Sequence, residues 1–140
     1  MILRPFRPWH VDWIKTSGLP VGGWLDPSEE MLLALERHNS WTAINDEGEP
    51  IACGGTVQIW PGRHSAWAYM GVVTAPHMVA ITRFAQECLE KVKGRIEMTV
   101  RVDFEAGHRW AKMLGFKCET PVMPFYGPDG EPHSSYVRIN

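Results

Sequence analysis

The chain has 140 residues, of which 44% are hydrophobic and 21% charged, with a formal net charge of −2. This length and composition predict a single domain, residues 1–140, with an ordinary buried core. The near-neutral charge gives no reason to expect nucleic acid or an anionic membrane as a partner. No apolar run approaches the roughly 20 residues that span a bilayer, and no signal-peptide segment opens the chain. A cytoplasmic location is therefore expected.

The opening residues predict a short strand followed by two helices. Residues 2–8 are apolar and basic with two prolines, which is typical of an opening or edge strand. A brief helix is expected over Val11–Thr16. A second helix should begin at Asp26, which can cap it, with Pro27 in the first helical position, and should run to about His38.

The middle of the chain predicts an antiparallel meander. Residues 41–44 and 50–59 have the composition of strands, and the Asn-, Asp- and Gly-containing segment 45–49 between them suits a tight turn. A second turn is expected at 61–64, leading into a strand that ends near Val73.

The second half alternates between helix and strand. A helical pattern covers His77–Lys93 and ends at Gly94, and apolar residues then alternate with polar ones over 95–102. A strand, a crossover helix and a strand predict a right-handed parallel unit. A last helix, capped by Asp103 and terminated by Gly115, should precede two more strands, 116–122 and 134–139.

Cysteine and histidine usage argues against a disulfide or a metal centre. The three cysteines are odd in number and far apart, and each has apolar neighbours, which favours buried free thiols: Cys53, Cys88 and Cys118. The six histidines show no ligand spacing with one another or with cysteine, so no metal site is expected. Most of the seven tryptophans should pack in the interior, with Trp24 and Trp60 in turns as candidates for lining a cleft or an interface.

This element order resembles the GCN5-related N-acetyltransferase (GNAT) superfamily. The most specific local matches are Ile51–Gly55, similar to the family's third strand, and Trp110–Phe116, similar to the end of its fourth helix. The resemblance implies an α+β fold, with a mixed, mostly antiparallel twisted sheet flanked by helices and a β-α-β-α acyl-CoA half. It also implies transfer of an acyl group, most simply acetyl from acetyl-CoA, to an amine of a protein or small molecule.

The resemblance also assigns cofactor-binding residues. The family's fourth strand has a bulge and separates from the fifth, and its free backbone groups bind pantetheine. Val72 and Val73 fit that place, and Gly71 would permit the bulge or would only relieve crowding. The family's pyrophosphate loop, patterned Arg/Gln-x-x-Gly-x-Gly/Ala, corresponds to 77–82.

That loop lacks both glycines in this chain. Only His77, the small Ala80 and the hydroxyl of Thr82 remain to favour a phosphate at the positive end of the helix. The run is equally consistent with an ordinary helix start on a fold that does not bind CoA.

The acid and base are less clearly marked. Family members often place a tyrosine four residues before the glycine of Leu-Gly-Phe, and Ala111 occupies that position here. Tyr126 and Tyr69 are the candidates for a substitute acid. Glu97 is the candidate base, since the family uses carboxylates on the fourth or fifth strand; the alternative is a solvated or salt-bridged residue beside Arg101.

A narrower resemblance connects the small size, the altered loop and the Pro50–Gly55 segment to small phage-encoded acetyltransferase-type proteins. These include an internal virion protein of T7-like podophages. It implies an alternative to the enzyme: a non-catalytic virion component or host-modulating binding protein, located in the host cytoplasm or the virion. A protein partner or homo-oligomer would then be expected.

Overall fold

The computed structural model describes residues 1–17 and 28–140. Within them the strands are β1 (Ile2–Pro5), β2 (Asn39–Ile44), β3 (Pro50–Trp60), β4 (Arg63–Met70), β5 (Arg95–Arg101), β6 (Lys117–Met123) and β7 (His133–Ile139). The helices are α1 (Pro8–Ser17), α2 (Glu29–Glu36), α3 (Ala75–Glu90) and α4 (Glu105–Met113).

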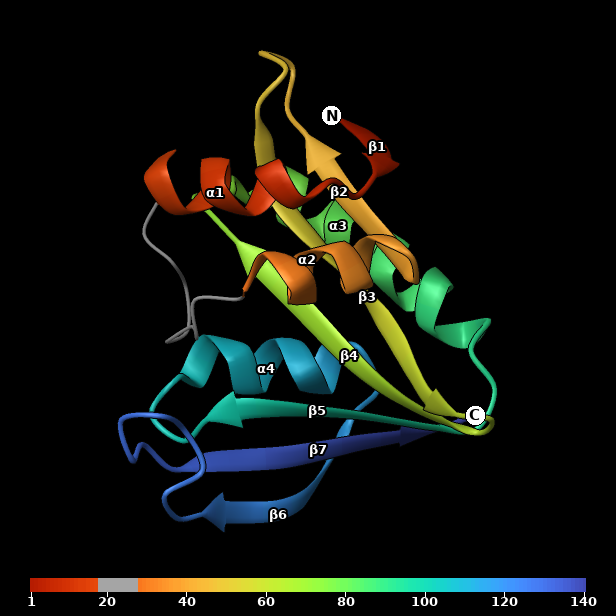
Figure 1. Cartoon of the computed structure of the whole chain (residues 1–140), viewed down its shortest axis with the longest axis vertical. Coiled ribbons are helices and arrows are strands. Elements are labelled where there is room, and N and C mark those ends of the chain that lie inside the picture. Colours follow the sequence, from red (N-terminus) through yellow and green to blue (C-terminus); the bar gives the residue numbers. More distant parts are fainter. Residues whose placement is uncertain (18–27) are drawn as a thin grey trace.

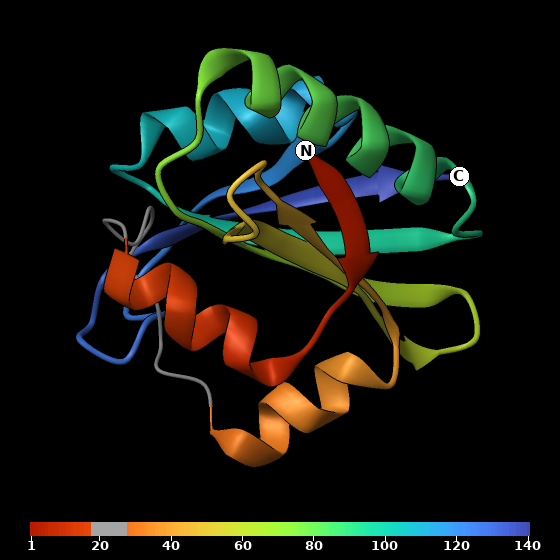
Figure 2. The ribbon, with the colours of Figure 1, turned by 90° about the horizontal axis from the view of Figure 1, so that it is seen from above.

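The strands form one twisted mixed sheet in the order β1-β2-β3-β4-β5-β7-β6 (Figure 1). Neighbouring strands pair antiparallel throughout, except for the parallel pair β4–β5 that α3 connects. Helices α1 and α2 lie on one face of the sheet, and α3 and α4 lie on the other (Figure 2). The predicted α+β class and mostly antiparallel sheet are confirmed.

Each face of the sheet has its own apolar cluster. On the α3/α4 face, buried side chains of α3 and α4 pack on alternate residues of β5, including Ile81, Leu89, Ile96, Val100 and Ala111. On the α1/α2 face the cluster contains Phe6, Val11, Ile14, Leu32, Leu35, Cys53 and Tyr69. Side chains alternate across a strand, so one strand contributes to both clusters.

Helices α1, α2 and α3 begin at different residues from those expected, and α1 starts at Pro8, three residues before Val11. The predicted cap Asp26 lies outside the described residues, and Ser28 caps α2 by accepting the Met31 N–H at 3.1 Å. Helix α3 starts at Ala75, two residues before the expected His77. A proline is tolerated in the first turn of a helix, because the N–H that it lacks has no intrahelical partner there.

The predicted cap at the start of α4 was wrong, and the predicted end at Gly115 is confirmed. Asp103 does not cap this helix; its carboxylate accepts two bonds from Arg101, at 3.0 and 3.1 Å. At the other end Gly115 has φ +85°, its N–H donates to Lys112 O, and Phe116 N–H donates to Ala111 O. This is a Schellman ending, which requires the left-handed backbone that glycine tolerates.

The cysteine expectation holds for part of the set. Cys53 is buried, Cys88 is half-buried, and both are free thiols. Cys118, by contrast, is exposed, because β6 is the last strand of the sheet and its side chains are mostly solvent-facing.

Among the described residues, none of the helices combines the length and apolar character that a bilayer crossing requires.

The buried His10 should make the fold sensitive to mild acid. Its Nδ1 accepts the Arg7 N–H at 3.0 Å and lies 2.7 Å from Thr42 Oγ1, and burial lowers its pKa from 6.5. The unfolded chain therefore binds a proton more tightly than the folded chain, and stability falls as the pH drops below 6.5. Urea denaturation at pH 7 and pH 5 should show this loss. His10→Gln, which keeps an acceptor, should show a smaller loss between the two pH values; an equal loss would assign the acid sensitivity elsewhere.

Candidate functional site

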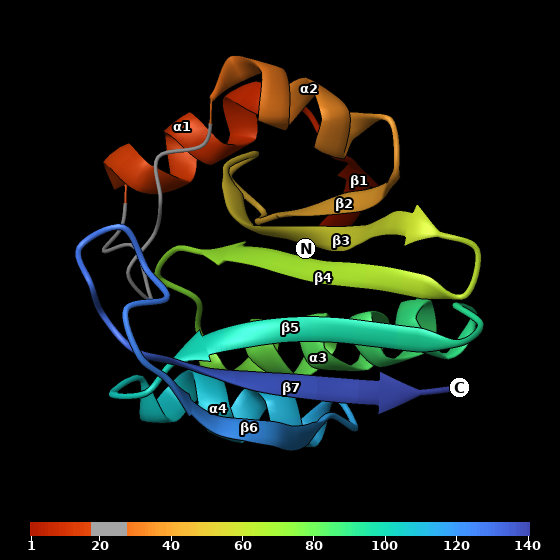
Figure 3. The same cartoon turned by 60° about the horizontal axis from the view of Figure 1, so that its bottom comes forward.

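Strands β4 and β5 pair over a short length and then separate. Their parallel register covers only Arg63↔Arg95, His64↔Ile96 and Ser65↔Glu97. Beyond these pairs the strands diverge toward their carboxyl ends (Figure 3). Residues 66–70 of β4 and 98–101 of β5 therefore present strand edges that the β4–β5 ladder does not use.

A cleft of about 1280 Å³ follows this separation. Strands β4 and β5, helices α3 and α4, and the loop between β6 and β7 all contribute to its lining. Ala66, Met70 and Met98 lie toward the α3/α4 face, whereas Trp67 and Tyr69 lie toward the α1/α2 face. A ligand lying between the strands would thus meet backbone edges and apolar side chains together.

Glu97 lies at the closed end of the cleft and is held by two arginines. The Arg63 guanidinium donates to both carboxylate oxygens, and Arg95 Nε lies 3.3 Å from Oε1. The hydrogen bond from Arg63 is the largest cause of a pKa below the usual range for this carboxyl. The expected neighbour Arg101 bonds Asp103 instead. Glu97 is therefore a salt-bridged strand residue that also lines the cleft.

Replacing Glu97 should test this ion-pair cluster. The lowered pKa means that the carboxylate stabilises the fold above pH 4.5 and that this contribution is lost as the pH falls through the folded-state value. Glu97→Gln should cost about 1 kcal/mol at pH 7 and should flatten the acid side of the stability profile. Chemical denaturation from pH 3 to pH 8 measures both effects. An unchanged acid limb would show that the arginine bonds add nothing to stability.

The strand-end residues are only partly gathered at the cleft. Val73 and Gly71 line it, but Val72 is 73% exposed and does not. The expected bulge is not at Gly71: β4 ends at Met70, and the register shift between β3 and β4 lies near Ile59. Gly71 instead donates its N–H to Ile51 O at 2.9 Å.

The early start of α3 changes the setting of the other cofactor candidates. Met78 N–H bonds Thr74 O, so the amides without an intrahelical partner belong to the turn that ends at His77. Ala80 is exposed in the second turn. Thr82 donates to Met78 O at 2.8 Å and accepts Trp110 Nε1–H at 2.9 Å, so its hydroxyl is engaged toward α4.

The candidate acids have different exposures. Tyr126 lines the cleft, is 55% exposed, and packs against the His133 ring at 5.1 Å between centroids. Tyr69 is 3% exposed within the α1/α2 cluster. Ala111 is fully buried, so no proton donor stands at the position where the family often has its tyrosine.

Three residues that the sequence analysis did not select also line the cleft. His64 Nδ1, Trp67 Nε1 and both ring nitrogens of His133 are buried without a hydrogen-bond partner among the described residues. Such groups are rare in folded proteins, because an unsatisfied buried polar atom is costly. His64 and Trp67 could have been found from their position in the strand before the crossover helix. No sequence pattern pointed to His133.

Of the two tryptophan candidates, only Trp60 belongs to the described residues, and it does not line the cleft. Trp60 is 57% exposed and stacks under the Arg63 guanidinium at 4.6 Å, and Trp24 lies outside the described residues. In the described part of the chain, no three histidine, cysteine or acidic side chains are grouped as metal ligands.

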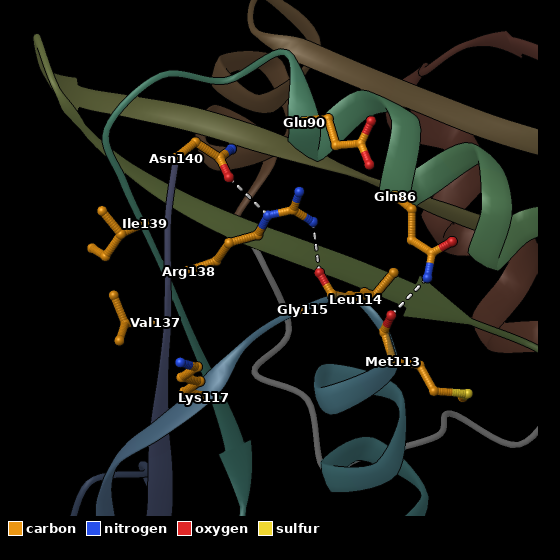
Figure 4. Close-up of a pocket in the computed structure, with 10 residues that line it drawn as sticks. All are labelled: Gln86, Glu90, Met113, Leu114, Gly115, Lys117, Val137, Arg138, Ile139 and Asn140. Carbon is orange, nitrogen blue, oxygen red and sulfur yellow. Dashed lines mark hydrogen bonds between the residues drawn. The ribbon is translucent and has the colours of Figure 1, made fainter.

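A second pocket of about 540 Å³ lies where α3, α4 and β7 end (Figure 4). Its polar groups are used to tie these ends together. Arg138 donates to Leu114 O at 2.7 Å and to Asn140 Oδ1 at 3.0 Å, and Gln86 donates to Met113 O at 2.6 Å. We therefore assign this pocket a structural role and the β4–β5 cleft the functional one.

Comparison with known proteins supports the fold assignment. No protein-family model matches the chain, and no curated protein matches it. Solved acetyltransferase structures match over nearly the full length. Ard1 from Thermoplasma volcanium is 18% identical with a TM-score of 0.73, covering 99% of this chain and 96% of its own. The ribosomal-protein-S5-alanine acetyltransferase from Vibrio fischeri is 14% identical at 0.70, covering 99% and 92%.

A third match was solved with a ligand. The GNAT superfamily phosphinothricin acetyltransferase from Sinorhizobium meliloti, in complex with AcCoA, is 14% identical with a TM-score of 0.65. It covers 98% of this chain and 86% of its own. At these identities the comparisons show that the chain has the GNAT fold.

Proposed function

We propose that the protein is an acyl-CoA-dependent N-acyltransferase that transfers acetyl from acetyl-CoA to an amine of a protein or small molecule. The observation that carries this proposal is the separation of β4 from β5 beyond Ser65 and Glu97. It opens a cleft of about 1280 Å³ in a fold shared with a structure solved with AcCoA.

The acyl and pantetheine groups would lie along the free edge of β4, with Val73 and the exposed Val72 at its end. The pyrophosphate would lie over the first turns of α3, which contain His77, Ala80 and Thr82. Backbone N–H groups and the positive end of the helix favour an anion there. The hydroxyl of Thr82 is already bonded to Trp110, so the first-turn amides are the main groups proposed to bind the pyrophosphate.

Much of the rate enhancement would come from positioning, because a neutral amine held against a thioester carbonyl reacts readily. Tyr126 is the proposed proton donor to the departing thiolate. Glu97 is the base proposed from the sequence. It would take the amine proton through a water molecule, since its carboxylate oxygens are already bonded to arginines. The acceptor is proposed to approach from the side of the 123–133 loop and of residues 19–26; the latter lie outside the described residues.

Calorimetric titration of the full chain with acetyl-CoA tests the proposal directly. We expect a saturable heat with a micromolar dissociation constant and about one site per chain. Acetate and free pantetheine serve as control ligands that lack the pyrophosphate. A flat titration at high micromolar acetyl-CoA would contradict the proposal.

The second candidate is a binding protein of the GNAT fold without turnover. The buried Ala111 at the usual acid position favours it, together with the missing glycines at the start of α3. The comparisons lend no support to a phage origin, so a virion role remains only a hypothesis within this alternative. Light scattering coupled to size exclusion distinguishes it: a stable oligomer without acetyl-CoA affinity would favour the binding role.

A further inference from the structure

The open end of the cleft holds a cluster of three titratable side chains, which we call the His133 corner: Tyr126, Glu131 and His133. All three line the cleft. The rings of Tyr126 and His133 pack at 5.1 Å, and His133 Nε2 lies 3.7 Å from Glu131 Oε1. The side chains of His133 and Glu131 are only 14% and 16% exposed, whereas Tyr126 is 55% exposed.

The loop before β7 holds the Glu131 carboxylate in place. Its Oε2 accepts the Asp129 N–H at 3.0 Å, and its backbone oxygen accepts the Gly127 N–H at 3.0 Å. Hydrogen bonds from backbone amides, its own first, lower the pKa of this carboxyl. A Cβ at Gly127 would lie 1.8 Å from Glu131 Oε1, so the close approach requires glycine.

His133 is unusual because both ring nitrogens are buried and neither has a hydrogen-bond partner within residues 1–17 and 28–140. A buried group of this kind carries a desolvation cost that a ligand or water in the cleft would remove. The carboxylate beside Nε2 favours the tautomer with its proton on that nitrogen, which leaves the lone pair of Nδ1 free. Glu97, the other candidate base in the cleft, has its oxygens bonded to Arg63 and Arg95.

We infer that His133 is the proton acceptor of the proposed acyl transfer and that Glu131 is the residue that positions it. This inference rests on the proposed function. An ammonium acceptor would lose one proton to His133 Nδ1 through a bridging water. The neutral nitrogen would then attack the thioester carbon; the C–N bond forms and the C–S bond breaks. The second nitrogen proton replaces the one that Tyr126 gives to the thiolate, and the imidazolium returns its proton to solvent.

The charges around the corner are compatible with this role. Arg101 of β5 is the register partner of His133, and its guanidinium is neutralised by Asp103 at 3.0 Å. From β6 the register partner is the uncharged Met123. Glu131 is thus the charged group that faces the imidazole from its own loop, and it would stabilise the imidazolium.

Hydrolysis of acetyl-CoA alone tests the inference without knowledge of the acceptor, because water then replaces the amine. The probe is acetyl-CoA, and the release of the CoA thiol is followed from pH 5 to pH 9. We expect the wild-type chain to exceed the buffer rate and His133→Gln to lower the enzymatic rate about 100-fold. The dissociation constant for acetyl-CoA should stay within threefold. His38→Gln, the same change at an exposed histidine outside the cleft, is the matched control.

Two further variants separate the roles. Glu131→Gln should lower the rate less than His133→Gln does while leaving the dissociation constant for acetyl-CoA within threefold; a purely structural role would weaken binding together with the rate. Glu97→Gln compares the two candidate bases. The inference is overturned if His133→Gln hydrolyses as fast as wild type, or if the wild-type chain binds acetyl-CoA but never exceeds the buffer rate. Absent calorimetric binding would instead overturn the proposed function.

Discussion

Gly55→Ala is expected to destabilise the fold by about 3 kcal/mol, which lowers the melting temperature by roughly 10 °C. A Cβ at Gly55 would lie 2.1 Å from Asn39 O and 2.8 Å from Ser40 Cα. Both atoms belong to the backbone of β2, which cannot move aside without losing its pairing with β3. Differential scanning calorimetry measures the effect.

Gly71→Ala is the matched control for this prediction. There a Cβ would lie 3.4 Å from Ile51 O and 3.5 Å from Ile14 Cγ2, which are ordinary contacts. The reduced freedom of the unfolded chain should balance any small crowding, so we expect a change within about 0.5 kcal/mol. Equal effects at Gly55 and Gly71 would contradict the assignment of the clash to β2.

Ala75→Glu is expected to weaken acetyl-CoA binding by about 10- to 100-fold while leaving the melting temperature unchanged or slightly higher. Ala75 is exposed at the first position of α3, where a carboxylate interacts favourably with the helix dipole. The same charge would repel a pyrophosphate bound to the amides of that turn. Ala75→Gln, similar in size and uncharged, should bind acetyl-CoA nearly as well as wild type.

Ala80→Glu locates the pyrophosphate along the helix. Ala80 is exposed one turn further on, so its substitution should also leave stability unchanged. A loss confined to Ala75→Glu would place the phosphates on the first-turn amides, and a loss at Ala80→Glu would favour the placement inferred from the sequence. Full binding by both variants would exclude α3 as the phosphate site.

Most elements of the fold could be predicted from local patterns. Alternation over 95–102 predicted β5, which spans Arg95–Arg101. Gly115 predicted the end of α4, because a left-handed residue there has few alternatives to glycine. The start of α3 was missed although Thr74 and the following Pro76 are typical of a helix start; Thr74 makes no side-chain capping bond. Asp103 is a residue type that often caps a helix, but its carboxylate accepts hydrogen bonds from Arg101 instead.

The site was harder to predict because its geometry depends on contacts between distant residues. The arginine that holds Glu97 most tightly is 34 residues away, at the start of the neighbouring strand. His133 reaches the cleft only because β7 inserts between β5 and β6 in the sheet. Neither arrangement follows from spacing along the chain. Of the residues selected from the family resemblance, Glu97, Val73 and Tyr126 line the cleft, whereas Val72, His77, Ala80 and Thr82 do not.

The short β4–β5 ladder joins the two parts of the sheet, β1–β4 and β5–β7, at one end only. At that end, three residue pairs join the two parts, together with the bonds of Glu97 to Arg63 and Arg95. Gly71 and His133 lie toward the other, open end. A small rotation at the joined end changes the width of the open end most. Because salt screens ion pairs, we expect high ionic strength to weaken the joined end of the cleft first.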